Sequence, residues 1–184
     1  MNSKIKRIID FSTAFGPSGM EDEVSSLAME DVKDICEVHD DTMRNTYMHF
    51  KQDKEHETTI LLDAHADEVG FIVQAIKPNG TIRFLPLGGW DPKNIVSGEV
   101  WILNDKGEKI SGIVASQPVH FLSEEKRNGK VDFDDLVIDV GATSVQEVKE
   151  EFHISVGNFM CPAVTCKYDE AHKIFLGKAF DCRI

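Results

Sequence analysis

The sequence lacks the features of a membrane protein, a secreted protein or a nucleic-acid-binding protein. No apolar run approaches the length needed to cross a bilayer. The start, MNSKIKRIIDFSTAFG, has neither the long apolar core nor the small-residue cleavage site of a secretory signal. Lysine and arginine number 20 against 32 aspartates and glutamates, and the net charge of -12 argues against nucleic acid and anionic membranes as partners. We therefore expect a cytoplasmic protein that binds neither.

Cysteine is also scarce, and its spacing gives no support for a zinc knuckle or a thioredoxin motif. The four cysteines, Cys36, Cys161, Cys166 and Cys182, form no Cys-x-x-Cys pair. In a cytoplasmic chain they are most simply free thiols. The composition, 41% hydrophobic and 28% charged over 184 residues, is that of a globular protein with one sizeable core or two small ones.

Apolar spacing and turn residues predict an α/β fold. Helices are expected over residues 3–14 and 20–34, the second with Ser18 and Glu21 as a capping box. Strands are expected over residues 37–42, 45–52, 58–64 and 69–76. Shorter β-rich segments then follow over residues 81–86, 99–103, 109–116 and 136–140, with one short helix over residues 145–151.

The end of the chain returns to a strand and a polar cluster over residues 173–184, which indicates that the β-rich part is an insertion. We expect a partial open-sheet α/β domain formed by residues 1–75 and 167–184. The inserted domain, residues 76–166, should be small, β-rich and barrel-like.

A polar cluster follows the most apolar of the expected strands. The stretch TTILLDAHADEVGF, residues 58–71, begins as a buried strand and then breaks into acids around one histidine. Side chains at the carboxyl end of a strand in an open α/β sheet project into the crevice where ligands bind. His65 offers an imidazole nitrogen to a divalent metal, and Asp67, on the same face of an extended chain, could orient that ring. A lone His-x-Asp is more often a hydrogen-bonded turn, so a second stretch is needed to favour a metal site.

The second stretch is AFDCR, residues 179–183. Asp181 follows an apolar pair, as the acids around His65 follow theirs. A carboxylate can bridge two metals while an imidazole holds one. Taken alone, Asp181 is better explained by an ion pair with Arg183 or by a turn.

Taken together, several stretches resemble one family. They are GPSGMEDEV, DAHADEVGFIV, LGGWDP, the segment over residues 156–158, and KAFDCR, in this order. They are similar to the metal-dependent aminopeptidases that assemble into tetrahedral dodecamers, which include glutamyl and deblocking aminopeptidases and are often labelled endoglucanase or cellulase. Asn45 and His120 also match the family's pattern. The similarity covers nearly the whole chain, and its motifs are specific in combination although each is weak singly.

The resemblance implies a catalytic α/β domain that holds two divalent metal ions, usually zinc or cobalt. By position, His65 matches the family's first metal-binding histidine, Asp67 the catalytic acid that orients it, and Asp181 the carboxylate that bridges the two metals. The implied reaction is hydrolysis of the N-terminal peptide bond of a peptide substrate by a metal-activated water. The resemblance also implies a homo-oligomer, with dimers that assemble into a dodecamer through the inserted domain.

The chain departs from the family at three places. Cys182 follows the bridging aspartate where the family has Asp or Asn, and Arg44 stands where it usually has glycine. The sequence ends at Ile184, before the family's general-base glutamate, the neighbouring metal-binding glutamate and a later acid and histidine. We therefore expect an N-terminal half that is inactive as a peptidase on its own.

Two other functions stay open. A non-catalytic oligomerisation module would keep the inserted domain without the chemistry. A glycoside hydrolase would need two carboxylates flanking a glycosidic bond, but such an enzyme has no use for His65 between acids. In the inserted domain, Trp90, Trp101 and Phe121 are candidates for subunit contacts, and the two tryptophans are equally good candidates for its core.

Overall fold

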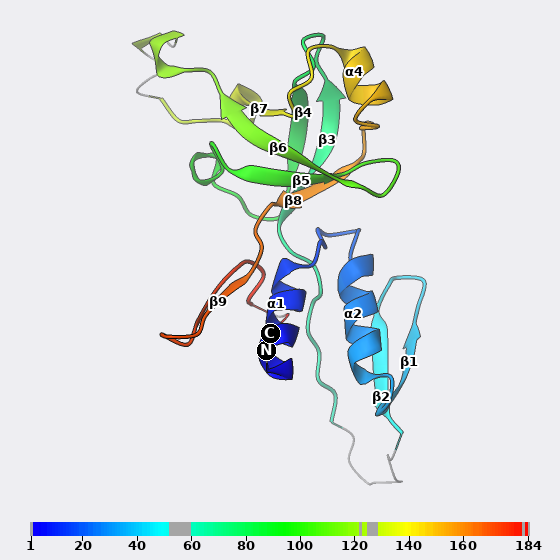
Figure 1. Cartoon of the computed structure of the whole chain (residues 1–184). Coiled ribbons are helices and arrows are strands. Elements are labelled where there is room, and N and C mark those ends of the chain that lie inside the picture. The colour runs from blue at the N-terminus through cyan, green and yellow to red at the C-terminus, as the bar shows by residue number, and fades with distance from the viewer. Residues whose placement is uncertain (1, 52–59, 122, 125–128, 182, 184) are drawn as a thin grey trace. The chain divides into compact units, whose positions relative to one another are not determined.

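The chain forms two compact units. The computed structural model describes residues 2–51, 60–121, 123–124, 129–181 and 183 (Figure 1). Unit 1 consists of residues 1–67 and 165–184, and unit 2 of residues 68–164. Unit 2 therefore begins at Glu68 rather than at residue 76, because the strand after Asp67 pairs within the β-rich part. The two units are described separately below.

Two helices start unit 1. Helix α1 spans Ser3–Thr13, and the side chain of Asn2 caps it by accepting a hydrogen bond from the Lys4 backbone nitrogen at 3.0 Å. Helix α2 spans Asp22–Val32 and begins with two acids, which favour the positive end of the helix dipole. The expected capping box is wrong, because α2 starts after Glu21. The carboxylate of Glu21 instead accepts from the Gly19 backbone nitrogen at 2.6 Å.

Two antiparallel hairpins complete the regular structure of unit 1. Strands β1, Cys36–Asp40, and β2, Thr46–Phe50, pair with each other and contact α2. Strands β9, Lys167–Asp169, and β10, Ile174–Leu176, form the second hairpin, and β9 contacts α1. In the turn between β1 and β2, Arg44 has a φ of 66°, the left-handed conformation that glycine adopts without strain. The turn is therefore kept although arginine stands where the resembling family usually has glycine.

The segment before His65 differs from its expected form. Residues 60–66 belong to no strand, and Ile60, Leu61 and Leu62 are 82%, 83% and 90% exposed. The prediction of a buried strand is therefore wrong for residues 60–64, and residues 58–59 lie outside the described part. Apolar composition favours a strand, but burial requires a neighbouring strand or helix, and the described part of unit 1 places none over these side chains.

Unit 2 is a closed, antiparallel six-stranded barrel. Its strands are β3, Gly70–Ile76; β4, Ile82–Leu87; β5, Glu99–Leu103; β6, Lys109–Ser116; β7, Leu136–Asp139; and β8, Phe159–Pro162. They pair in the order β3-β4-β7-β6-β5-β8, and β8 closes the barrel on β3 (Figure 1). Short 3-10 helices lie at Pro92–Asn94, Val119–Phe121 and Phe133–Asp135. The expected barrel-like, β-rich part is confirmed, and β5 and β6 have the predicted bounds.

The core of unit 2 fills the barrel. The largest buried side chains include Phe71, Ile82, Ile102, Ile138 and Met160, each at most 1% exposed. Helix α4, Val145–Glu150, adds Val148 to this core and is capped as predicted, because Ser144 Oγ accepts from the Glu147 backbone nitrogen at 3.1 Å.

The aromatic residues proposed for subunit contacts divide into two kinds. Trp90 is partly buried against the barrel core, stacks on Phe71 at 4.9 Å and donates from Nε1 to the Gly70 carbonyl at 3.0 Å. Trp101 is half-buried beneath the ammonium of Lys109. Phe121, by contrast, is 74% exposed. Phe121 is thus the most exposed of the three aromatic side chains. Among the described residues, no helix is long and apolar enough to cross a membrane.

Candidate functional site

Three residues from two distant segments of the sequence meet in unit 1. Nδ1 of His65 lies 2.9 Å from Oδ1 of Asp67, and Nε2 of the same ring lies 3.2 Å from Oδ2 of Asp181. The two carboxylates therefore contact opposite nitrogens of one imidazole. The structure brings together all three predicted site residues.

Chain geometry explains this meeting. His65 and Asp67 are two residues apart in a segment that forms neither helix nor strand, and their side chains contact each other there. Asp181 arrives from the turn that follows β10, where Ala179 has a φ of 55°. A non-glycine residue in this region carries strain, and such strain is concentrated at functional sites.

The site has the electrostatics of a cation site. Partial burial of the imidazole lowers the pKa of His65, but the charge of Asp181 and the hydrogen bond to Asp67 outweigh it, so that pKa lies above its ordinary value of 6.5. The His65 side chain is 51% exposed and Asp181 70%, so a solute can reach both. The two carboxylates thus favour positive charge at the ring.

A divalent metal fits the pair formed by His65 and Asp181. A carboxylate that accepts the Nδ1 proton fixes the ring tautomer and leaves the Nε2 lone pair available, which is how metal-binding histidines are usually held. Imidazole nitrogen and carboxylate oxygen both suit zinc and related ions. Within the described part of the chain, however, no group of three or more His, Cys, Asp or Glu residues is arranged to hold a metal. The described residues therefore place two candidate ligands, His65 and Asp181, beside one carboxylate that contacts the ring, and Cys182 lies outside them.

Arg183 is a residue of this region whose role the sequence did not reveal. It is 9% exposed and donates from Nε to the Ala66 carbonyl at 2.6 Å, directly between His65 and Asp67. Its place two residues after Asp181 was the available signal, but it suggested only an ion pair with that aspartate. The contacts with distant backbone carbonyls could not be seen in the sequence.

Two other residues that carry the resemblance, Asn45 and Asn158, hold loops and turns in place by hydrogen bonds. Asn45 donates from Nδ2 to Asp41 at 2.9 Å in the β1–β2 turn. Asn158 accepts from the Ser155 backbone nitrogen at 2.7 Å and donates to Asp105 at 2.9 Å. These contacts give the motifs a structural role without adding ligands to the site.

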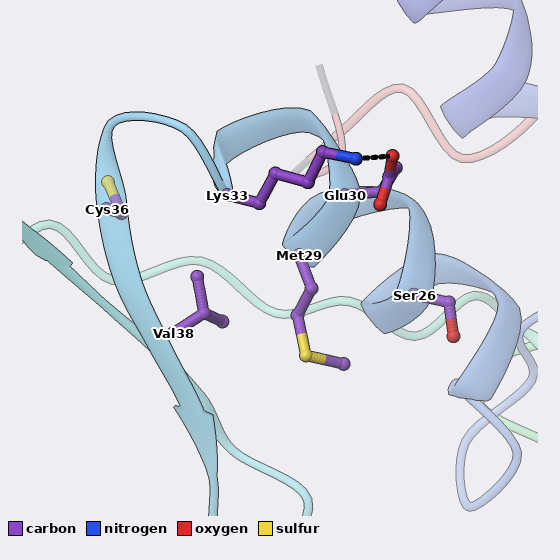
Figure 2. Close-up of a pocket in the computed structure, with 6 residues that line it drawn as sticks. All are labelled: Ser26, Met29, Glu30, Lys33, Cys36 and Val38. Carbon is purple, nitrogen blue, oxygen red and sulfur yellow. Dashed lines mark hydrogen bonds and ion pairs between the residues drawn. The ribbon is translucent and has the colours of Figure 1, made fainter.

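A separate hollow of about 480 Å³ lies between α2 and β1. Figure 2 shows its lining, with Lys33 paired to Glu30; the remaining lining residues are Ser26, Met29, Cys36 and Val38. None of the three predicted site residues lines it. The His65 cluster is therefore a more specific candidate than this open hollow, whose one ion pair is already satisfied.

Known proteins are similar to this chain in both sequence and fold. The family model described as M42 glutamyl aminopeptidase matches residues 45–184. The lysyl aminopeptidase of Pyrococcus furiosus is 33% identical over 149 residues, which are 79% of this chain and 41% of that enzyme.

Solved structures of aminopeptidases are also similar to this chain in fold. The TET aminopeptidase of the marine sediment archaeon Thaumarchaeota archaeon SCGC AB-539-E09 has a TM-score of 0.90 at 34% identity, over 98% of this chain and 50% of that one. The TET1 peptidase of Pyrococcus horikoshii, described as able to assemble into a tetrahedron or a large octahedral shell, has a TM-score of 0.77 at 27% identity, over 92% and 49%. The chain thus spans about half the length of these solved relatives.

Proposed function

This chain belongs to the M42 glutamyl aminopeptidase family, and we propose that it carries part of the metal site of an aminopeptidase that removes N-terminal residues from peptides. The observation that supports this most directly is the His65 ring between Asp67 and Asp181. The names of the matched proteins differ in the residue removed, glutamyl in one and lysyl in another. The proposal is therefore restricted to the reaction class.

In this proposal each of the three side chains has one task. Asp67 accepts the Nδ1 proton of His65 and keeps Nε2 free, and Asp181 presents a carboxylate oxygen beside Nε2. Two divalent ions, with zinc or cobalt as the family's usual choices, would lower the pKa of a bound water and polarise the scissile carbonyl. His65 would hold one of them and Asp181 would bridge both.

Further groups are needed for turnover. A hydrolase of this type requires more ligands and a base within hydrogen-bond reach of the water. The acid nearest to the cluster in sequence, Glu68, is buried in unit 2. We propose that the base and the remaining ligands lie in the part of the relatives' length that this chain does not match.

We also propose that the protein is a homo-oligomer and that unit 2 makes the contacts. The assembly described for the P. horikoshii relative supports this, as does the exposed Phe121 on unit 2. Sedimentation of the wild-type chain and of Phe121→Ser tests it. A wild-type chain that stays monomeric at high concentration would contradict the proposal. The expected cytoplasmic location stays a prediction.

The competing functions are less well supported. A glycosidase needs two carboxylates that act on opposite sides of a glycosidic bond, whereas Asp67 and Asp181 both contact the same imidazole. A non-catalytic module would not require that three-residue geometry.

One assay separates the three functions. The product of the complete reading frame is given aminoacyl-anilides and a cellulosic substrate, each with and without a chelator. We expect chelator-sensitive release of the anilide and no cellulose hydrolysis. Cellulose hydrolysis would favour the glycosidase, and absence of both activities in the metal-loaded protein would favour the non-catalytic module.

A further inference from the structure

Arg183 is surrounded by backbone carbonyl groups of unit 1. Besides the contact with Ala66, Nη1 donates to the Ala14 carbonyl at 3.0 Å and reaches the Phe11 carbonyl at 3.5 Å, and Nη2 donates to the Gly16 carbonyl at 2.8 Å. The guanidinium thus joins the end of α1 and the turn after it to the segment that carries His65.

The surroundings suit a guanidinium specifically. The carbonyls of Phe11 and Ala14 lie at the end of α1, where unpaired carbonyls and the negative end of the helix dipole favour a cation. The planar guanidinium has five donors in a fixed fork, so one side chain can serve carbonyls on different segments. A lysine ammonium is a compact point charge and cannot span the same set.

Arg183 links the two segments that form the candidate site, one with His65 and Asp67 and the other with Asp181. Its Nε holds the carbonyl of Ala66, whose two neighbours in sequence are His65 and Asp67. Its own backbone follows Asp181 by two residues. One buried side chain therefore ties the segment that supplies the imidazole and its orienting acid to the segment that supplies the second carboxylate.

We propose that Arg183 is a positioning residue, whose contact with the Ala66 carbonyl sets the approach of Asp181 to His65. The inference deepens the proposed function, because its consequence for metal binding depends on that site. Arg183 touches neither metal nor substrate in this role. It acts by fixing the backbone on which the ligands stand.

A substitution at Gly16 can disturb the contacts of the Arg183 guanidinium while Arg183 itself is kept. A Cβ atom at Gly16 would lie 2.5 Å from Arg183 Nη2 and 2.7 Å from Val24 Cγ2. Gly16→Ala therefore displaces the guanidinium without changing its charge. It should reproduce part of the effect of Arg183→Met.

Ser12 provides a matched control for loss of stability. It is buried, and its Oγ donates to the Lys178 carbonyl at 2.6 Å and accepts from the Lys178 nitrogen at 3.2 Å. Ser12→Ala thus weakens another tie between α1 and the end of the chain, but it leaves Ala66 untouched. A role of Arg183 in general stability alone predicts that both substitutions act alike on the site.

The experiment uses nitrogen-resolved NMR of the His65 ring in the 184-residue chain, first without metal and then during a Zn²⁺ titration. The variants are Arg183→Met, Arg183→Lys, Gly16→Ala and Ser12→Ala. We expect Arg183→Met to shift the His65 Nε2 signal, because Asp181 contacts that nitrogen, and to weaken Zn²⁺ binding about tenfold or more, the usual effect of losing a partner that orients ligands. Arg183→Lys should recover part of the loss, and Ser12→Ala should bind as the wild type does.

Equal effects of Arg183→Met and Ser12→Ala, or an unchanged His65 signal in folded Arg183→Met, would overturn the proposal. If the wild-type ring does not respond to Zn²⁺, the metal-site proposal fails. The Arg183 inference is then decided by the metal-free signals. A far-ultraviolet circular dichroism melt of each variant shows which remain folded at the measuring temperature.

Discussion

Oδ2 of Asp181 lies 3.2 Å from Nε2 of His65, although one residue follows a C-terminal strand of unit 1 and the other precedes the barrel. The other nitrogen of the ring already contacts Asp67. The imidazole is thereby fixed in direction by one acid and faces the second. Two ligand atoms this close can bind one ion, because ligand distances to zinc are about 2.0–2.2 Å.

The metal prediction follows from this pair. His65→Ala and Asp181→Asn should each abolish the response of the chain to Zn²⁺, because each removes one of two available ligands. Asp169→Asn is the matched control, since Asp169 also contacts a histidine, His172, at 2.7 Å but has no part in the cluster. Isothermal titration calorimetry measures the binding. Full Zn²⁺ affinity in either of the first two variants would remove the residue from the site.

A pH prediction concerns unit 2. Hydrogen bonds from Ser155 Oγ and the Asn158 amide hold the pKa of Asp105 below its ordinary value of 3.8. The unfolded chain therefore binds this proton at a higher pH than the folded chain does. The stabilisation is present in full above the unfolded value and is lost as the pH falls through the lower folded value.

In Asp105→Asn, the free energy of unfolding should therefore fall less as the pH is lowered than it does in the wild type. Urea unfolding from pH 6 down to pH 2 measures this slope, and Glu99→Gln, an exposed carboxylate on β5, is the control. An unchanged slope in Asp105→Asn would show that these hydrogen bonds do not favour the ionised form.

The left-handed backbone at Arg44 predicts that replacing this residue by glycine changes stability very little. Glycine relieves the left-handed strain of about 1–2 kcal/mol but loses the exposed ion pair with Asp22, which contributes little to stability in water. It also adds about 0.5–1 kcal/mol of chain entropy in the unfolded state. Arg44→Gly should therefore be nearly neutral in thermal unfolding, whereas Arg44→Val should be clearly destabilising. The reverse order would mean that the turn changes its conformation.

The exposed apolar segment predicts self-association. Three neighbouring large side chains at Ile60, Leu61 and Leu62 lie in a segment whose backbone is not part of a strand. Such a segment can pair with another copy. Leu62→Lys should reduce association in sedimentation velocity and leave stability within about 0.5 kcal/mol, as for other surface changes. Ile174→Lys, a similar change on β10, should have no such effect.

The 184-residue chain by itself should not turn over peptides. It presents one imidazole, one facing carboxylate and one orienting acid, and these do not supply a base for the water. With zinc or cobalt added, release of anilide from aminoacyl-anilides should stay at the level of His65→Ala. Robust, chelator-sensitive turnover would show that the base lies within this chain.

The meeting of His65, Asp67 and Asp181 could be expected only from the resemblance to a family, because neither short stretch taken alone favoured a site over a turn. His65 and Asp67 are two residues apart in one segment, whereas Asp181 lies in a turn far along the chain, and local sequence does not show that the two segments meet. Five of the six barrel strands could be predicted, because alternation and glycine-bearing turns mark them locally, whereas β8 at Phe159–Pro162 was missed. Residues 99–103 and 109–116 show this best.

Features that depend on distant contacts could not be predicted. Ile60, Leu61 and Leu62 have strand composition, but their burial depends on a partner that local sequence does not specify. Arg183 looked like an ion-pair partner, whereas its contacts with carbonyls of residues 11–16 and 66 exist only in the fold. The capping box failed because α2 starts only after Glu21, whose carboxylate accepts from the Gly19 backbone nitrogen.

The closure of the barrel also affects the entropy of assembling the site. Strands β3 and β8 are neighbours, so Phe71 lies opposite Met160 once the barrel has formed. The effective loop that joins His65 to Asp181 then shortens roughly fourfold, which lowers its closure cost by about 1 kcal/mol. A folded barrel therefore lowers the entropy cost of bringing together the segments that carry His65 and Asp181. Substitutions that open β3 from β8 should loosen the site without touching any residue in it.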